Sequence, residues 1–74
     1  MARLPNEEWL VQSIGGDTVV FRESDGYELV RVPSGDPGAI GPALRIVATT
    51  SLLDLEDRAL ALFWLGYFHA HAAG

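Results

Sequence analysis

The sequence predicts a small α+β domain in which an antiparallel β-meander of three or four strands is followed by one long C-terminal α-helix. Two observations support this fold class. Residues 8–32 contain short blocks of β-branched and aromatic residues separated by glycine-containing turns, whereas residues 52–72 are rich in leucine and alanine and follow a helical period. A chain of 74 residues has room for one hydrophobic core, so we expect residues 1–74 to form a single domain.

The meander is expected to contain three strands in its first part, at residues 9–14, 18–23 and 27–32. The second turn, Ser24-Asp25-Gly26, can be tested for register. A two-residue loop would place Glu23 opposite Glu28, and like charges that face each other across a hairpin are unfavourable. We therefore predict a three-residue loop with Gly26 in the left-handed conformation.

This loop fixes the cross-strand partners of the second hairpin. The predicted pairs are Arg22 with Glu28, Phe21 with Leu29, and Val20 with Val30. Side chains alternate between the two faces of a strand. One face of the hairpin is then expected to carry Val19, Phe21, Tyr27 and Leu29, and the other Val20, Arg22, Glu28, Val30 and Val32.

Residues 33–42 and 43–50 connect the meander to the helix. The first segment, "PSGDPGAIGP", holds three prolines and three glycines, which indicates an irregular connecting loop. The second, "ALRIVATT", is compatible with a strand or a short helix. Its alternation and its β-branched residues favour a strand, which would be the fourth of the sheet.

The C-terminal helix is expected over residues 52–72. Ser51 is the predicted N-cap, and the acidic residues that follow suit the positive end of the helix dipole. On a helical wheel, Asp54, Asp57 and Arg58 gather on one side, which we interpret as the solvent face. The opposite side, predicted to lie on the sheet, carries Leu52, Leu55, Ala59 and Leu62.

The second half of this helix lacks a polar face. Residues 59–73 contain no formally charged side chain, and Leu65 and Phe68 continue the side that we interpret as solvent-facing. An exposed apolar patch in a soluble protein usually marks a protein contact. The expected interface residues are Leu62, Trp64, Leu65, Phe68 and His71.

Self-association through this helix is the expected function of the interface, and another protein is the second possible partner. Ala59, Gly66 and Ala70 fall within about 40° of one another on the wheel and would allow close helix packing. The competing explanation is that the rest of the chain wraps around the helix and buries it.

Catalysis is not expected, because no set of residues with recognisable catalytic spacing is present. The sequence has no cysteine, which removes thiol chemistry and thiolate zinc sites. His69 and His71 are two positions apart and point about 200° from each other on a helix, so one helix cannot present both to one metal. The acidic residues near the helix start are better explained by capping. We expect a non-enzymatic protein without cofactor, metal or evident small-molecule substrate.

The charge balance restricts the possible partners. Ten acidic residues stand against five arginines, giving a net charge of -5, and we therefore do not expect nucleic-acid binding. An acidic inhibitor or mimic that binds a host protein is an alternative function. The absence of lysine is typical of GC-rich coding sequences, such as those of an actinobacterium or one of its phages.

Membrane association is the remaining alternative. The uncharged helical run would extend about 22 Å, which is shorter than a hydrocarbon core of about 30 Å. Surface-lying helices usually carry a Lys/Arg-rich polar face, which this helix lacks. We therefore do not expect a membrane protein, although a lipid-associated role stays an alternative. The first residues do not resemble a secretory leader, which favours the cytoplasm.

Overall fold

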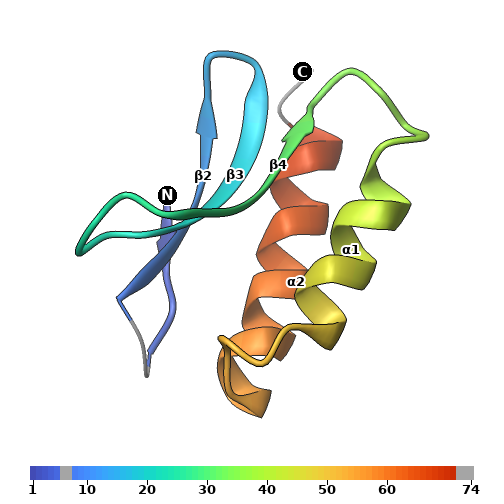
Figure 1. The fold of residues 1–74 in the computed structure, drawn as a ribbon. Helices are drawn as coiled ribbons and strands as arrows, with labels where there is room; N and C mark the ends of the chain where they lie inside the picture. Colours follow the sequence, from blue (N-terminus) through green and yellow to red (C-terminus); the bar gives the residue numbers. More distant parts are fainter. Residues whose placement is uncertain (6–7, 72–74) are drawn as a thin grey trace.

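The computed structural model describes residues 1–5 and 8–71 and shows a two-layer fold, with a four-stranded antiparallel sheet covered on one face by two helices (Figure 1). The strands lie side by side in chain order and the helices form an antiparallel pair. The elements are β1 (Ala2–Arg3), β2 (Trp9–Ile14), β3 (Asp17–Arg22), β4 (Glu28–Pro33), α1 (Ile40–Thr49) and α2 (Leu55–His71). The predicted α+β class, a meander followed by a C-terminal helix, is confirmed.

The strands of the meander agree with the prediction to within one residue, because local turns set their ends. Gly15, Gly16 and Gly26 all have positive φ, at 57°, 88° and 73°, a region that glycine enters without steric cost. The predicted pairing of Val20 with Val30 is confirmed. Towards the turn the prediction is wrong, because an irregularity between Val20 and Phe21 makes Glu28, and not Leu29, the partner of Phe21.

The inner face of the sheet provides the core that the helices cover. Val20, Val30 and Val32 lie there with Trp9 and Val11, and all five are buried in one cluster with residues of α1 and α2. The helices therefore cover the face of the sheet that was predicted to carry Val20, Val30 and Val32.

The expected contact between Arg22 and Glu28 is absent from the described structure. Arg22 binds Asp25 through two hydrogen bonds of 2.9 and 2.7 Å, and its guanidinium lies 5.5 Å from the centre of the Trp9 ring. Glu28 instead binds Arg31 on the outer side of the sheet. The bulge moves Glu28 away from Arg22, which explains the exchange of partners.

Residues 43–50 do not form the predicted strand. Residues 43–49 belong to α1, in which Ala43 and Val47, four positions apart, are buried against the core, and Thr50 is the C-cap. As a helix this segment covers β4 and packs against α2, and such tertiary burial outweighs the β propensity of its branched residues. The fourth strand is β1, which pairs with β2. The loop predicted at 33–42 is correspondingly shorter, since α1 begins at Ile40.

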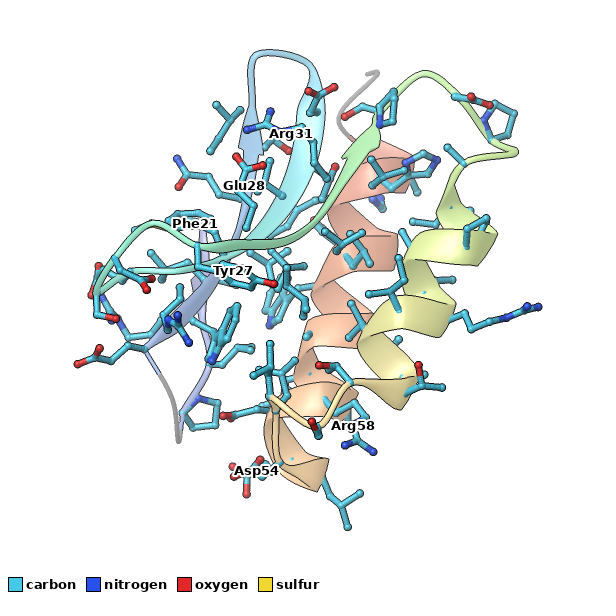
Figure 2. The ribbon with its side chains drawn as sticks, viewed as in Figure 1. Phe21, Tyr27, Glu28, Arg31, Asp54 and Arg58 are labelled. Atoms are coloured by element: carbon cyan, nitrogen blue, oxygen red, sulfur yellow. The ribbon has the colours of Figure 1, made fainter. Side chains whose placement is uncertain are left out.

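The start of α2 also differs from the prediction. The N-cap is Asp54 and not Ser51, because Oδ1 of Asp54 accepts a hydrogen bond from the backbone N–H of Asp57 at 2.8 Å. Arg58 donates from Nη2 to the carbonyl oxygens of Thr50 and Leu53, at 2.6 and 3.2 Å. Both side chains lie at the connection between the helices (Figure 2). These bonds fix how α2 leaves the connection. The predicted last helical residue, Ala72, lies outside the described residues.

The predicted sides of α2 agree with the structure only in part: Leu62 packs against the core and Asp54 is exposed, as predicted, but other residues lie on the opposite side. Asp57, Ala61 and Leu65 are 0% exposed and form the inner face. Leu55 and Ala59, which were expected on the sheet, are exposed. The acids at the helix start suggested a solvent face, whereas Asp54 caps the helix end and Asp57 is buried within the first turn. The solvent-facing interpretation of Asp57 is therefore wrong.

Candidate interaction face

The outward side of α2 carries apolar residues at every fourth position. Leu55, Phe63 and Tyr67 are 79%, 58% and 44% exposed, and the exposed Ala59 lies between the first two. Residues four apart share one face of a helix. In the part of the chain that the structure describes, the sheet and α1 contact α2 from its other sides. We name this surface, formed by Leu55, Ala59, Phe63, Tyr67, Ala70 and His71, the outer face of α2.

Three aromatic rings stack in a row along this face. Phe63 stacks on Tyr67 with ring centres 6.3 Å apart, and Tyr67 stacks on His71 at 4.2 Å. Nδ1 of His71 lies 2.8 Å from the carbonyl oxygen of Tyr67. Because a carbonyl oxygen only accepts, Nδ1 is the donor and carries a proton. The rings of Phe63, Tyr67 and His71 therefore form one stacked row along the helix.

A second pair of rings supports the first row from the core side. Trp64 and Phe68 stack at 5.5 Å, are half-buried and pack against the core cluster. Trp64 meets both Phe63 and Tyr67 edge-to-face, at 5.0 and 5.7 Å. Such contacts stabilise aromatic pairs by about 0.5–1.5 kcal/mol beyond burial. The outer rings are thus held in place by rings that are anchored in the core.

Small residues lie beside the outer rings. Ala59 and Ala70 are exposed, and Gly66 is half-buried. A Cβ atom added at Gly66 would meet nothing within 4 Å, so the surface beside Phe63 is open. A face with small residues next to large rings lets a second helix approach the α2 backbone closely and receive those rings in return.

The predicted interface residues lie partly in the core and partly on the surface. Leu65 is fully buried, so its assignment to a surface is corrected: it belongs to the core. Leu62, Trp64 and Phe68 are half-buried and pack against the core. His71 is exposed, as the prediction requires. The use of any of these residues in binding stays a prediction.

Sequence reasoning missed the exposure of three large apolar residues of the face, Leu55, Phe63 and Tyr67. Their spacing of four was a usable signal, since Leu55, Ala59, Phe63 and Tyr67 form one continuous row of a helix. The acidic residues near the helix start indicated the opposite side as the solvent face, although Asp54 caps the helix and Asp57 is buried.

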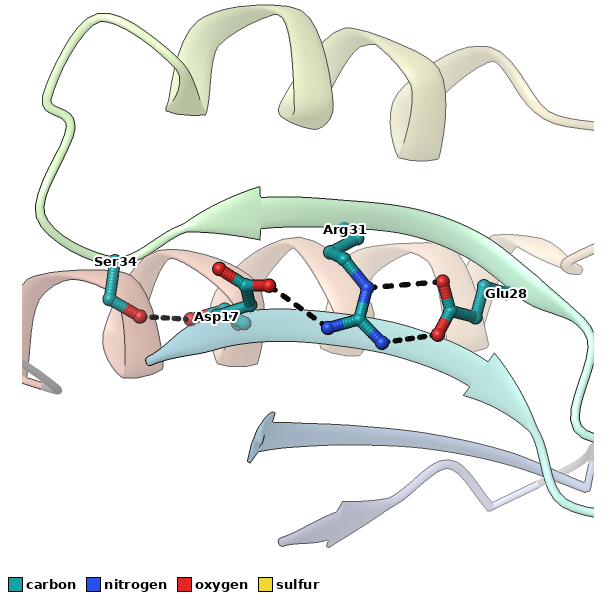
Figure 3. Close-up of polar contacts among 5 residues, drawn as sticks. Asp17, Glu28, Arg31 and Ser34 are labelled. Carbon is teal, nitrogen blue, oxygen red and sulfur yellow. Dashed lines mark hydrogen bonds and ion pairs between the residues drawn. The ribbon is translucent and has the colours of Figure 1, made fainter. Parts of the chain in front are cut away.

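The outer face of the sheet is the second surface that the described helices leave uncovered, and it is built differently. Arg31 bridges Asp17 and Glu28, with 2.9 Å between its Nη1 and the Asp17 carboxylate (Figure 3). Arg3 and Glu23 form a paired set of hydrogen bonds, both 2.8 Å long. The hydrogen bonds from Arg31 lower the pKa of Glu28, and those from Arg3 lower the pKa of Glu23. The sheet therefore presents paired charges.

The described residues offer no evident centre for catalysis or metal binding. No group of three or more potential metal-ligating His, Cys, Asp or Glu side chains occurs among residues 1–5 and 8–71, and no pocket opens between them. Within the same residues, no helix is both long and apolar enough to cross a bilayer. The outer face of α2 is the feature that calls for a functional explanation.

Comparison with protein-family models, with curated proteins and with solved structures finds no significant match to this chain. The functional argument below therefore uses the surfaces of the chain itself.

Proposed function

We propose that this protein is a small non-enzymatic interaction domain that forms a homodimer through the outer face of α2. One observation carries the proposal: Leu55, Phe63 and Tyr67 are exposed on one side of the helix, in a row with Ala59. Contiguous apolar surface of this kind usually marks a protein contact, and aromatic residues dominate the binding energy of such contacts.

The size of the chain supports self-association as the form of this contact. A domain of 74 residues buries only about 60% of the surface of its unfolded chain, so its stability is small. Small domains commonly gain stability from disulfides, metals or oligomerisation. The sequence has no cysteine for the first of these. A dimer interface on α2 would add buried apolar area to the existing core.

The acidic-mimic alternative receives less support. Arg3, Arg22 and Arg31 pair with Glu23, Asp25, Asp17 and Glu28, so much of the acidic charge on the sheet is locally balanced. A mimic of nucleic acid needs a continuous negative surface. We therefore rank binding through the outer face of α2 first.

The test compares masses in solution for three proteins at two concentrations thirty-fold apart. Light scattering behind a sizing column should give the wild type twice the chain mass of 8.0 kDa. Phe63→Glu should give a folded monomer, because it places a charge at the centre of the contact. Ile14→Glu is the matched control, since Ile14 is an exposed apolar residue (40%) on the sheet; it should stay dimeric.

Four results would contradict the proposal. One is a wild type that remains monomeric at both concentrations. Another is a Phe63→Glu protein that keeps the dimer mass. The third is loss of the helical circular-dichroism signal in Phe63→Glu, which would mean that this residue supports the fold itself. If Phe63→Glu and Ile14→Glu weaken association equally, general charge and not the outer face of α2 is responsible.

A further inference from the structure

The outer face of α2 differs between its two ends in both charge and side-chain size. Glu56 is exposed in the first turn and His71 is exposed in the last. Along the face, small residues alternate with large ones: Ala59 precedes Phe63, and Ala70 follows Tyr67. A surface with two unlike ends is matched better by one relative orientation of a second copy than by the other. The inference that follows rests on the proposed dimer.

Side-chain size favours two antiparallel copies that cross at Phe63. In that arrangement, residues equally far before and after Phe63 meet across the two-fold axis. Ala59 then faces Tyr67 of the second copy. Small residues thus receive larger ones, as in close helix packing. A parallel pair in register would instead place Tyr67 against Tyr67 and Ala59 against Ala59. The two tyrosines would then be crowded, and the two alanines would leave a gap.

Charge favours the same orientation. Antiparallel copies bring Glu56 of one chain within about one helical turn of His71 of the other. The two Glu56 carboxylates then lie at opposite ends of the contact. A parallel pair would place the Glu56 carboxylates side by side. Antiparallel helices also align their dipoles favourably.

We propose that two copies of this chain pair through an antiparallel α2–α2 contact that crosses at Phe63, with Ala59 facing Tyr67 and the Glu56 end facing the His71 end. The contact is symmetric and closes on itself, so it yields a dimer and leaves no second copy of the same surface free for further growth.

Cysteine cross-linking tests the orientation, because the natural sequence has no cysteine. Glu56 and Ala70 lie seven positions before and after Phe63, so they face each other directly in the antiparallel pair. Each position is about 21 Å from its own copy, at 1.5 Å per residue over fourteen positions. A disulfide needs Cα atoms closer than about 7 Å. Glu56→Cys and Ala70→Cys are both exposed changes that leave the aromatic rings in place.

The expected result is that neither single variant forms a covalent dimer under mild oxidation, whereas an equimolar mixture does, as seen on a non-reducing gel. Ser24→Cys, in the exposed β3–β4 turn, is the control and should not cross-link alone or in mixtures. Cross-linking of each single variant alone would overturn the antiparallel orientation in favour of a parallel one. No cross-link in a mixture that light scattering shows to be dimeric would also overturn it. A monomeric mass for the wild type would contradict the dimer itself, and so separates the two proposals.

Discussion

The outer face of the sheet and the outer face of α2 both carry apolar residues, but some of these residues are buried on the sheet, whereas those on α2 are exposed. On the sheet, Leu10 and Val19 point outward yet are only 3% and 1% exposed. The cross-strand neighbours of Val19 are Gln12 and Arg31, whose long side chains lie beside it. On α2, Phe63 and Tyr67 have rings for neighbours and stay open to solvent. Long polar side chains, and not a lower apolar content, distinguish the closed surface from the open one.

The largest expected effect on stability comes from a substitution on the side of α2 that faces the core. Leu65→Ala should lower the free energy of unfolding by about 2–5 kcal/mol, because Leu65 is fully buried and its truncation leaves a cavity. The measurement is urea unfolding in the Phe63→Glu background, which removes the contribution of association to apparent stability.

The matched comparison is Tyr67→Ala in the same monomeric background. Tyr67 lies two positions away on the open side of α2, and its loss should change the unfolding free energy much less than the loss of Leu65. Equal losses for the two variants would show that α2 is buried on both sides and that the outer face is part of the core.

A smaller effect is expected on the sheet, where Arg31→Ala removes two ion pairs and the cover beside Val19. Exposed ion pairs contribute little to stability, and the side chain of Arg31 is 40% exposed, so we expect a loss of unfolding free energy that is well below that of Leu65→Ala. Urea unfolding at low and high salt measures it. Arg45→Ala is the control: Arg45 is exposed on α1 and forms no ion pair among the described residues. A similar loss in both variants would mean that Arg31 does not protect the sheet.

The parts of the fold that sequence reasoning predicted well depend on short-range rules. The strand ends follow from glycines that tolerate positive φ. The predicted three-residue loop is wrong, since Phe21 pairs with Glu28 and the backbone N–H of Arg22 donates to the carbonyl oxygen of Tyr27, and the Val20–Val30 pair is restored by the irregularity between Val20 and Phe21. The strand prediction for residues 43–50 was wrong because their sequence fits both structures: the alternating pattern suits a strand, and the spacing of Ala43 and Val47 suits a helix. Packing against the sheet decides between the two. The bulge that reassigned Glu28 has no comparable sequence mark.

The candidate site was harder to predict because it depends on the rotation of one helix. Which residues share a side of α2 follows from helical geometry. Which side faces the sheet depends on the cap at Asp54 and on the bonds from Arg58 to the preceding carbonyl oxygens. Of the residues that these contacts join, Thr50 was predicted in a strand, and Leu53 and Asp54 were predicted inside the helix. An acidic residue near a helix start is therefore a poor marker of the solvent side until its capping role is excluded.

The smallest expected effect is the pH dependence of one charge pair in the sheet layer. The hydrogen bonds from Arg22, followed by that from the backbone N–H of Tyr27, lower the pKa of Asp25 from its ordinary 3.8 to about 2. The same Arg22 guanidinium lies over the rings of Trp9 and Tyr27, so the pair also holds a cation on an aromatic surface. A pKa that is lower in the folded chain means that the carboxylate stabilises the fold above about pH 4 and that this contribution disappears as pH falls towards about 2.

Asp25→Asn removes the titrating group, so the wild type should exceed it in unfolding free energy at pH 5, and the two should converge between about pH 4 and pH 2. Thermal or urea unfolding across this range measures the difference. Asp36→Asn is the control, because it removes one negative charge from a loop residue that forms no ion pair within the described chain. Parallel curves for wild type and Asp25→Asn would show that the pair adds no stability. Convergence confined to Asp25→Asn would show that charges hold the sheet surface together, in contrast to the uncharged rings of α2.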